Sequence, residues 1–280
     1  MESIISHYCN CLIFRLHTQR FEFRALDSVF FPAGKAGNVF RGALGMLLPE
    51  MLAATPPILR RPAGFADPPR PFVLRAAHLD GCVVDPGAAF RIDIHVFDRK
   101  SGLIEKLAQA CGELAQTGLG PGRALVELLP PRLPVEVEVD LVARDLQSRV
   151  TVSFLTPTEL KGMPGGVSGG LDELPFSVLF ARARDRVSAL ASLYGDGPLL
   201  LDFSGMARRA ASVRTIGCRL SRRDVVRRSS RTGQTHTIGG FTGSATYEGE
   251  LTEFMPFLRA VWYTGVGRHT VWGNGVISCE

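Results

Sequence analysis

The residues with the clearest chemical potential lie near the end of the chain, in residues 265–275, which read Gly-Val-Gly-Arg-His-Thr-Val-Trp-Gly-Asn-Gly. Their four glycines allow tight turns and let the backbone approach a ligand closely. Arg268 and His269 stand at the tip, where both side chains can meet a phosphate. No Gly-Lys-Ser/Thr follows and no helix is expected after the stretch, which argues against a P-loop and a dinucleotide fingerprint. A plain glycine-rich turn is the alternative interpretation.

A second feature is the run of arginines between residues 208 and 231, which holds nine arginines and a single acid, Asp224. Guanidinium groups bind phosphate oxygens two at a time, and a concentrated positive field attracts polyanions. A solvated basic face without a partner is the alternative, and we favour nucleic acid. The residues predicted to contact RNA are Arg222, Arg223, Arg227, Arg228 and Arg231 in this run, with Gly265, Gly267, Arg268 and Gly273 in the glycine-rich stretch.

Hydrophobic periodicity predicts the elements that must position these residues. The first half is expected to contain a strand within 12–24, a helix at 38–52 capped by Asn38, a strand at 90–97, a helix at 104–115 capped by Ser101, and strands at 124–129 and 135–143. The second half is expected to contain a strand at 150–155, a helix at 172–194, strands at 213–220 and 240–251, a helix at 251–260 and a last strand at 271–277.

The order strand, helix, strand, strand, helix, strand is the split βαβ pattern of a ferredoxin-like sheet, and we interpret the chain as two copies of this pattern. We therefore expect an α+β fold of two tandem ferredoxin-like βαββαβ domains, spanning residues 1–147 and 148–280, with a C-terminal glycine-rich loop. The absence of a long linker between the halves favours two domains packed together.

Composition limits the function classes. Hydrophobic residues make up 45% of the 280 residues and charged residues 21%, which is typical of a globular chain and argues against disorder. No apolar run reaches the roughly 18 residues of a membrane span, and the N-terminus does not resemble a signal peptide. Six cysteines in a chain of this length indicate reduced thiols. We expect a cytoplasmic protein with no membrane partner and no cofactor.

Five segments in order resemble one known family, the repeat-associated mysterious proteins (RAMPs) that process CRISPR precursor RNA. One of the five is the glycine-rich stretch, which is similar to the family's closing loop. The four that precede it are Phe40–Gly45 (Phe-Arg-Gly-Ala-Leu-Gly), residues 98–123 ending in Gly-Leu-Gly-Pro-Gly-Arg, residues 154–161 (Phe-Leu-Thr-Pro-Thr-Glu-Leu-Lys), and Arg228–Arg231 followed by residues 238–243. Each segment alone is a weak signal, but together they cover about 240 residues.

The resemblance implies an endoribonuclease that binds the hairpin of a CRISPR repeat and cuts at its 3′ base. Family members act without metal: the 2′-OH upstream of the cut attacks the phosphate and leaves a cyclic phosphate and a 5′-OH. This chemistry needs an aligned nucleophile, proton-transfer groups and cations around the phosphorane. The resemblance also implies that the product, the mature crRNA, stays bound among other CRISPR effector subunits.

The chain departs from the family in its histidines. None lies between Phe30 and Leu52, where many relatives carry the catalytic histidine, and Gly265 occupies the position of a second one. This arginine-for-histidine bias is similar to a divergent branch associated with type IV systems. The catalytic candidates are accordingly Arg24, Lys35, Arg41 and His269. The alternative is a non-catalytic RAMP subunit that only holds RNA in a CRISPR ribonucleoprotein.

Overall fold

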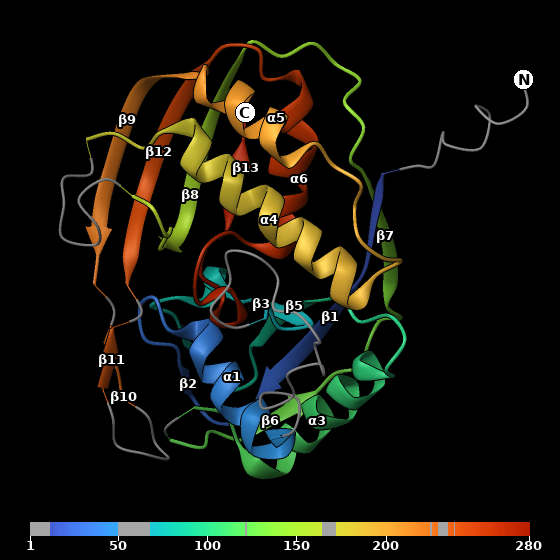
Figure 1. Ribbon diagram of the computed structural model, residues 1–280. Coiled ribbons are helices and arrows are strands. Elements are labelled where there is room, and N and C mark those ends of the chain that lie inside the picture. Colours follow the sequence, from blue (N-terminus) through green and yellow to red (C-terminus); the bar gives the residue numbers. More distant parts are fainter. Residues whose placement is uncertain are drawn as a thin grey trace, which may run out of the picture.

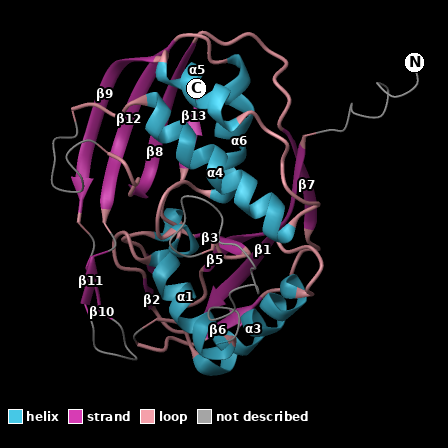
Figure 2. Cartoon of the chain, in the orientation of Figure 1, coloured by secondary structure: helices cyan, strands magenta, loops and turns pink. Residues whose placement is uncertain are grey.

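The computed structural model describes residues 12–49, 68–120, 122–163, 172–224, 226–228, 235–237 and 239–280. Two sheets, each covered by helices, form a lower and an upper half in the view of Figure 1, and Figure 2 separates the helices from the strands. The first half of the chain builds the lower sheet and the second half builds the upper one.

The first half contains the four strands and two helices of a ferredoxin-like unit. In chain order these are β1 (Ile13–Ala25), α1 (Ala36–Leu47), β3 (Phe72–Arg75), β5 (Ala89–Val96), α3 (Leu103–Thr117) and β6 (Val126–Leu128). The antiparallel sheet has the order β3-β5-β1-β6, so the first strand lies between the third and the fourth. Strand β7 (Val135–Asp140) lies outside this unit and pairs with β1. Three smaller elements also lie outside it: β2 (Val29–Phe30), η2 (Ala77–Leu79) and β4 (Val83–Val84).

The second half repeats the arrangement. Its elements are β8 (Arg149–Thr158), α4 (Phe176–Tyr194), α5 (Phe203–Ala211), β9 (Arg214–Arg223), β10 (Val226–Arg228), β11 (Thr235–Thr237), β12 (Gly240–Glu248), η4 (Thr252–Phe254), α6 (Met255–Thr264), η5 (Thr270–Trp272) and β13 (Ile277–Cys279). The antiparallel sheet order β13-β8-β12-β9 again places the first strand between the third and the fourth. The expected fold class is confirmed, with α5 and the β10–β11 hairpin as additions to the second unit.

Buried side chains explain why the two units pack against each other. Alternate residues of β8 (Val150, Val152 and Phe154) are buried against α4 and α6, as the period of a half-buried strand requires. The same core includes Phe14 and Leu16 of β1. Burial of such side chains stabilises each by roughly 1.5–3 kcal/mol. Side chains of β1 therefore extend the core of the second half, while a separate cluster that includes Phe21, Phe23 and Phe40 fills the first half. We propose that the domain boundary lies at residues 147/148, just before β8.

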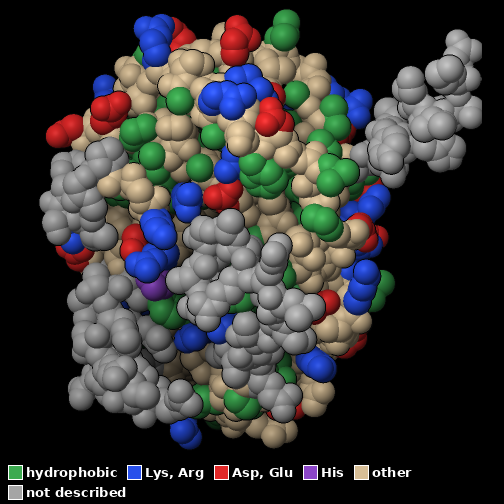
Figure 3. Space-filling view, viewed as in Figure 1, with side chains coloured by type: hydrophobic (Ala, Val, Ile, Leu, Met, Phe, Trp, Pro, Cys, Tyr) green, Lys and Arg blue, Asp and Glu red, His purple; other side chains and the backbone are tan. Residues whose placement is uncertain are grey.

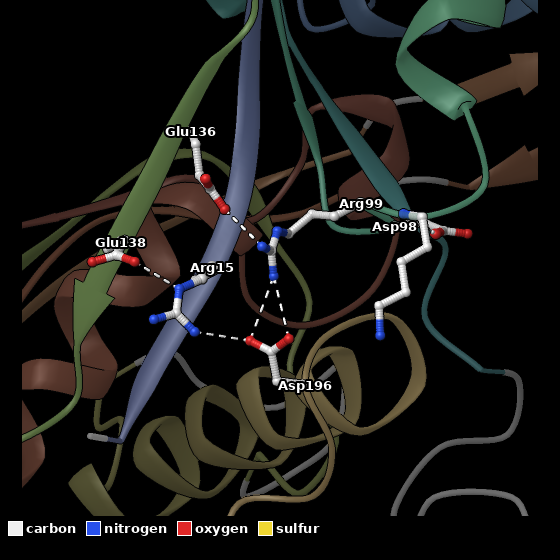
Figure 4. A network of polar contacts seen from close by, with 7 residues as sticks. Arg15, Asp98, Arg99, Glu136, Glu138 and Asp196 are labelled. Carbon is white, nitrogen blue, oxygen red and sulfur yellow. Dashed lines mark hydrogen bonds and ion pairs between the residues drawn. The ribbon is translucent and has the colours of Figure 1, made fainter. Parts of the chain in front are cut away.

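An ion-pair network also joins the halves (Figure 4). Asp196, which follows α4, accepts from Arg15 of β1 at 3.0 Å and from Arg99 at 3.4 Å. The two arginines reach back to β7, where Glu138 lies 2.6 Å from Arg15 and Glu136 lies 2.7 Å from Arg99. The hydrogen bond from Arg15, supported by the charge of Arg99, holds the pKa of Asp196 below its usual value.

Replacing Asp196 by asparagine should lower the stability of the protein at pH 7. Because the pKa of Asp196 is depressed by folding, its contribution is present above the unfolded value near 3.9 and is lost as pH falls through the folded value. Half the side chain is exposed, so we expect a loss of at most about 1 kcal/mol. Urea unfolding of both proteins at pH 7 and pH 3 measures the difference, and a gap that persists unchanged at pH 3 would contradict this origin.

The helix starts differ from those predicted. Helix α1 begins at Ala36, and Asn38 lies within its first turn. The first turn is capped from elsewhere, because the Ala36 N–H donates to Asp80 Oδ1 at 2.8 Å. Helix α3 follows Gly102 in a left-handed conformation, and Ser101 makes no side-chain cap. A cap supplied across 44 residues leaves no local sequence signal.

Two further elements also differ. Helix α4 starts at Phe176, after Pro175, so the expected residues 172–175 are not helical. The last strand is β13 (Ile277–Cys279), because residues 270–272 form the 3₁₀ turn η5. Among the described helices, none combines the length and apolar character needed to cross a membrane.

Candidate active site

The glycine-rich residues 265–275 form a loop that is pinned to the end of β8. Arg268 N–H donates to the Glu159 carbonyl at 3.0 Å, and Gly275 N–H donates to the Pro157 carbonyl at 3.0 Å. At Gly267 the backbone adopts a φ of 82°, and a Cβ there would lie 2.2 Å from the Glu159 oxygen. Glycine is therefore required by the close approach of two backbones, as well as by the left-handed conformation.

The same loop reaches the first helix of the other half. The Trp272 carbonyl lies so close to Gly37 of α1 that a Cβ on Gly37 would be 2.2 Å from its oxygen. A small cavity opens at this junction, with Asp80, Thr156 and Asn274 as polar lining. Partial burial raises the pKa of the Asp80 carboxyl. The hydrogen bonds that this carboxyl accepts from the backbone N–H groups of Ala36 and Lys35 oppose the shift. The site is thus built jointly by α1 and the C-terminal loop.

Replacing Gly37 by alanine should destabilise the protein by about 1–3 kcal/mol, because the added Cβ overpacks the contact between α1 and Trp272. Gly42 of the same helix provides the matched control. A Cβ there meets nothing within 4 Å, so Gly42→Ala should stabilise by up to about 1 kcal/mol through helix propensity. Chemical unfolding of the two variants gives the comparison, and equal stabilities would contradict the close packing at Gly37.

Cationic and aromatic side chains gather around Trp272. The His269 ring stacks on the indole with centroids 4.6 Å apart and planes 4° from parallel. The Arg41 guanidinium lies 4.9 Å from the centroid of the Trp272 ring, a cation–π distance. On the face shown in Figure 3, Lys and Arg side chains gather near a histidine at the level where the halves meet. This arrangement provides cations for a phosphate and an imidazole for proton transfer.

Glu159 completes the group. Its carboxylate lies 2.7 Å from Arg268 Nη1 through Oε1 and 3.5 Å from His269 Nε2 through Oε2. Only 16% of the Glu159 side chain is exposed. Sequence reasoning missed Glu159 and Trp272 as site residues, although both lie in segments that carry the family resemblance. Their roles depend on contacts between β8 and the loop, which the separate motifs do not reveal.

Three side chains hold the end of α6, from which the loop departs. Arg186 donates to the Thr264 carbonyl at 2.8 Å and Arg75 to the Trp262 carbonyl at 2.7 Å. His95 Nδ1 lies 2.9 Å from the Tyr263 carbonyl, and burial lowers the pKa of His95 to about 4. Arg186 and Arg75 bring positive charge to the C-terminal end of α6, where it complements the helix dipole, and the buried, neutral His95 contacts the same end.

The structure brings some of the predicted catalytic residues together. Arg41 and His269 both contact Trp272, and Lys35 directly precedes α1. Arg24 lies elsewhere: it is exposed on β1 and contacts Glu127 at 2.9 Å. Its neighbour Phe23 packs against Phe40 of α1, and successive strand residues face opposite sides, so Arg24 is on the face of the sheet away from α1.

The predicted RNA-binding arginines follow β9 into the β10–β11 hairpin, which projects from the upper sheet in Figure 1. Arg222 contacts Asp224 at 3.0 Å and Arg223 donates to the Thr242 hydroxyl at 3.2 Å. The backbones of Arg227 and Arg228 pair with β11. Arg231 lies outside the described residues, so its placement is not tested.

The arginine run is less uniformly positive in the fold than in the sequence. Arg209 contacts Glu253 at 2.5 Å, and Arg214 pairs with Glu248 across β9 and β12. Both acids lie outside the run in the sequence. Arg209 and Arg214 are consequently weaker candidates for RNA contacts than their place in the run suggests.

Comparison with known families shows which proteins the chain is similar to. Residues 152–277 match the family model described as the CRISPR-associated endoribonuclease Cas6. The resemblance is to Cas6. The matched part contains the glycine-rich loop and the arginines from Arg222 to Arg231, which we call the arginine arm. Arg41 and Lys35 precede the matched part. No curated protein matches the sequence.

Solved Cas6 structures share the fold over nearly the whole chain. A Cas6 (TTHB231) product complex superposes with a TM-score of 0.60 and 19% identity, covering 95% of this chain and 99% of that chain. Thermus thermophilus Cas6 (TTHB231) gives a TM-score of 0.55 and 16% identity, covering 97% of this chain and 100% of that chain. A Cas6 (TTHA0078) substrate mimic complex gives a TM-score of 0.52 and 19% identity, covering 95% of this chain and 100% of that chain. The resemblance to endoribonucleases that process CRISPR precursor RNA, inferred from the sequence, is confirmed.

Proposed function

We propose that this chain is an endoribonuclease that binds the hairpin of a CRISPR repeat and cleaves precursor CRISPR RNA by attack of a ribose 2′-OH, without a metal ion. The observation that carries the proposal is the meeting of α1 and the glycine-rich loop at Trp272, which gathers Arg41, Arg268 and His269 in one place. The family-model match and the fold of Cas6 complexes with product and substrate mimic support the substrate class.

The reaction needs few components. His269 transfers a proton, while Arg41 and Lys35 stabilise the negative charge that develops on the phosphorane; preorganised donors in such sites contribute about 10²–10³ in rate each. Arg268 and the glycines Gly265, Gly267 and Gly273 hold the RNA backbone close to the loop. Products are a cyclic phosphate and a 5′-OH.

Binding is proposed to depend on the arginine arm. Arg222, Arg223, Arg227, Arg228 and Arg231 contact phosphates of the hairpin, since double-stranded RNA is recognised mainly through its backbone and shape. Arg24 lies on the other face of the first sheet, paired with Glu127, and we propose no part for it in the reaction. The product then remains bound and joins other CRISPR subunits; a Cas6-RT-Cas1–Cas2 complex contains a chain with the same fold (TM-score 0.61, 9% identity, 95% of this chain and 29% of that chain).

The experiment that tests substrate class compares a repeat hairpin with a hairpin of the same length and stem stability but scrambled sequence. We expect binding and a single cut in the repeat, with weaker binding and no discrete cut in the scrambled hairpin. Equal cleavage of both RNAs would contradict recognition of the repeat.

A further inference from the structure

Glu159 stands in an unusual position between the two residues at the tip of the loop. Its backbone carbonyl accepts from Arg268 N–H, and its two carboxylate oxygens contact different partners, Oε1 the guanidinium and Oε2 the His269 ring. The side chain is mostly buried, at 16% exposure, so this carboxylate is not an incidental surface group.

We propose that Glu159 is a positioning residue for His269: it accepts a hydrogen bond from Nε2–H and thereby assigns proton transfer to Nδ1. The proposal rests on the function proposed above. No motif in the sequence singles out this pair, because Glu159 and His269 are 110 positions apart.

The imidazole is constrained from three directions. The tautomer of a histidine is set by the hydrogen bond that its second nitrogen makes, and a carboxylate acceptor favours a proton on the facing nitrogen. Stacking on Trp272 fixes the ring plane. The backbone of His269 has a φ of 60°, a conformation that is unfavourable for a non-glycine residue and persists only where the surroundings hold it.

Charge explains why a carboxylate is needed here. Charged groups near His269 are Arg268 beside it in the chain, Arg41, which also lies over the Trp272 ring, and Glu159 directly after β8. Two cations oppose a positive charge on the ring, and the Glu159 carboxylate compensates them. An imidazole that must accept a proton during the reaction requires such compensation.

The proton-transfer step follows from this tautomer. Nδ1 accepts the proton of the 2′-OH while the O2′ electron pair forms the bond to phosphorus. The P–O5′ bond breaks, and the leaving oxygen takes a proton from water. The imidazolium, protonated at both nitrogens and paired with Glu159, then returns its proton to solvent.

The test uses Glu159→Gln in the full chain. The ¹⁵N shifts of the His269 ring, assigned with His269→Ala, should show the Nε2–H tautomer in the wild type and a mixture in Glu159→Gln. Single-turnover cleavage of the repeat hairpin at saturating protein should slow about tenfold or more, with no weakening of the Kd. Asp140→Asn, which removes the exposed partner of Arg144, serves as a control and should change neither quantity.

A double-mutant comparison separates positioning from a general structural role. If Glu159 acts through His269, the variant His269→Ala/Glu159→Gln should cleave at the same rate as His269→Ala. A further loss in the double variant, or an Nδ1–H tautomer in the wild type, would overturn the proposal. Failure of the proposed function is distinguishable, because then the wild type makes no cut while the tautomer measurement still reports on the pair.

Discussion

Replacing Arg41 by alanine should slow cleavage of bound RNA by about 10²–10³, the cost of removing one preorganised charged donor from a transition state. The guanidinium lies over Trp272, 4.9 Å from the ring centroid, at the point where α1 meets the loop. Charge on the phosphorane develops only during the reaction, so binding of the uncut hairpin should weaken much less than the rate. Single-turnover rates at saturating protein and Kd values from filter binding measure the two effects separately.

Arg41→Lys keeps the charge but loses the planar stacking surface, so we expect it to retain part of the rate. Arg144→Ala provides a control: Arg144 follows β7 on the surface, where it pairs with Asp140, and its replacement should leave the rate unchanged. If Arg41→Ala reduced rate and affinity by the same factor, Arg41 would be a binding residue only.

Replacing Arg227, Arg228 and Arg231 together by alanine should weaken RNA binding and flatten its dependence on salt. Binding releases fewer counterions for each phosphate contact that is lost. The magnitude of the slope of log K against log salt should therefore decrease by about 2–3. Titrations at several salt concentrations give the slope directly. The corresponding lysine triple keeps the charges and should restore most of it. An alanine triple with the slope of the wild type would contradict an RNA-binding role for the arm.

Much of the fold could be predicted from periodicity. The alternation in β8 and the apolar stripe of α4 lie in single continuous segments, so local pattern is sufficient to find them. The short strand β3, by contrast, is only Phe72–Arg75, and it directly follows a proline-rich stretch. The cap of α1 by Asp80 crosses 44 residues. Such features arise from tertiary contacts and leave no local signature.

In the candidate site, too, local sequence identifies residues, whereas tertiary contacts decide which of them come together. Arg41 and His269 were singled out from separate motifs, and the fold joins them through Trp272. Arg24 is close to α1 in sequence, but strand alternation turns it to the opposite face of the sheet. Residue type and proximity in sequence suggest chemistry, whereas the direction of a side chain is decided by its strand register. The suggested type IV relationship stays a prediction.

The most direct test of metal-independent cleavage is incubation of the purified protein with end-labelled repeat hairpin in excess EDTA, with the ends of the products identified. We predict one cut at the 3′ base of the hairpin, with a 2′,3′-cyclic phosphate on the upstream fragment and a 5′-OH on the downstream one. Tight binding without any cut would contradict the account, and would make the chain an RNA-holding subunit of a CRISPR ribonucleoprotein.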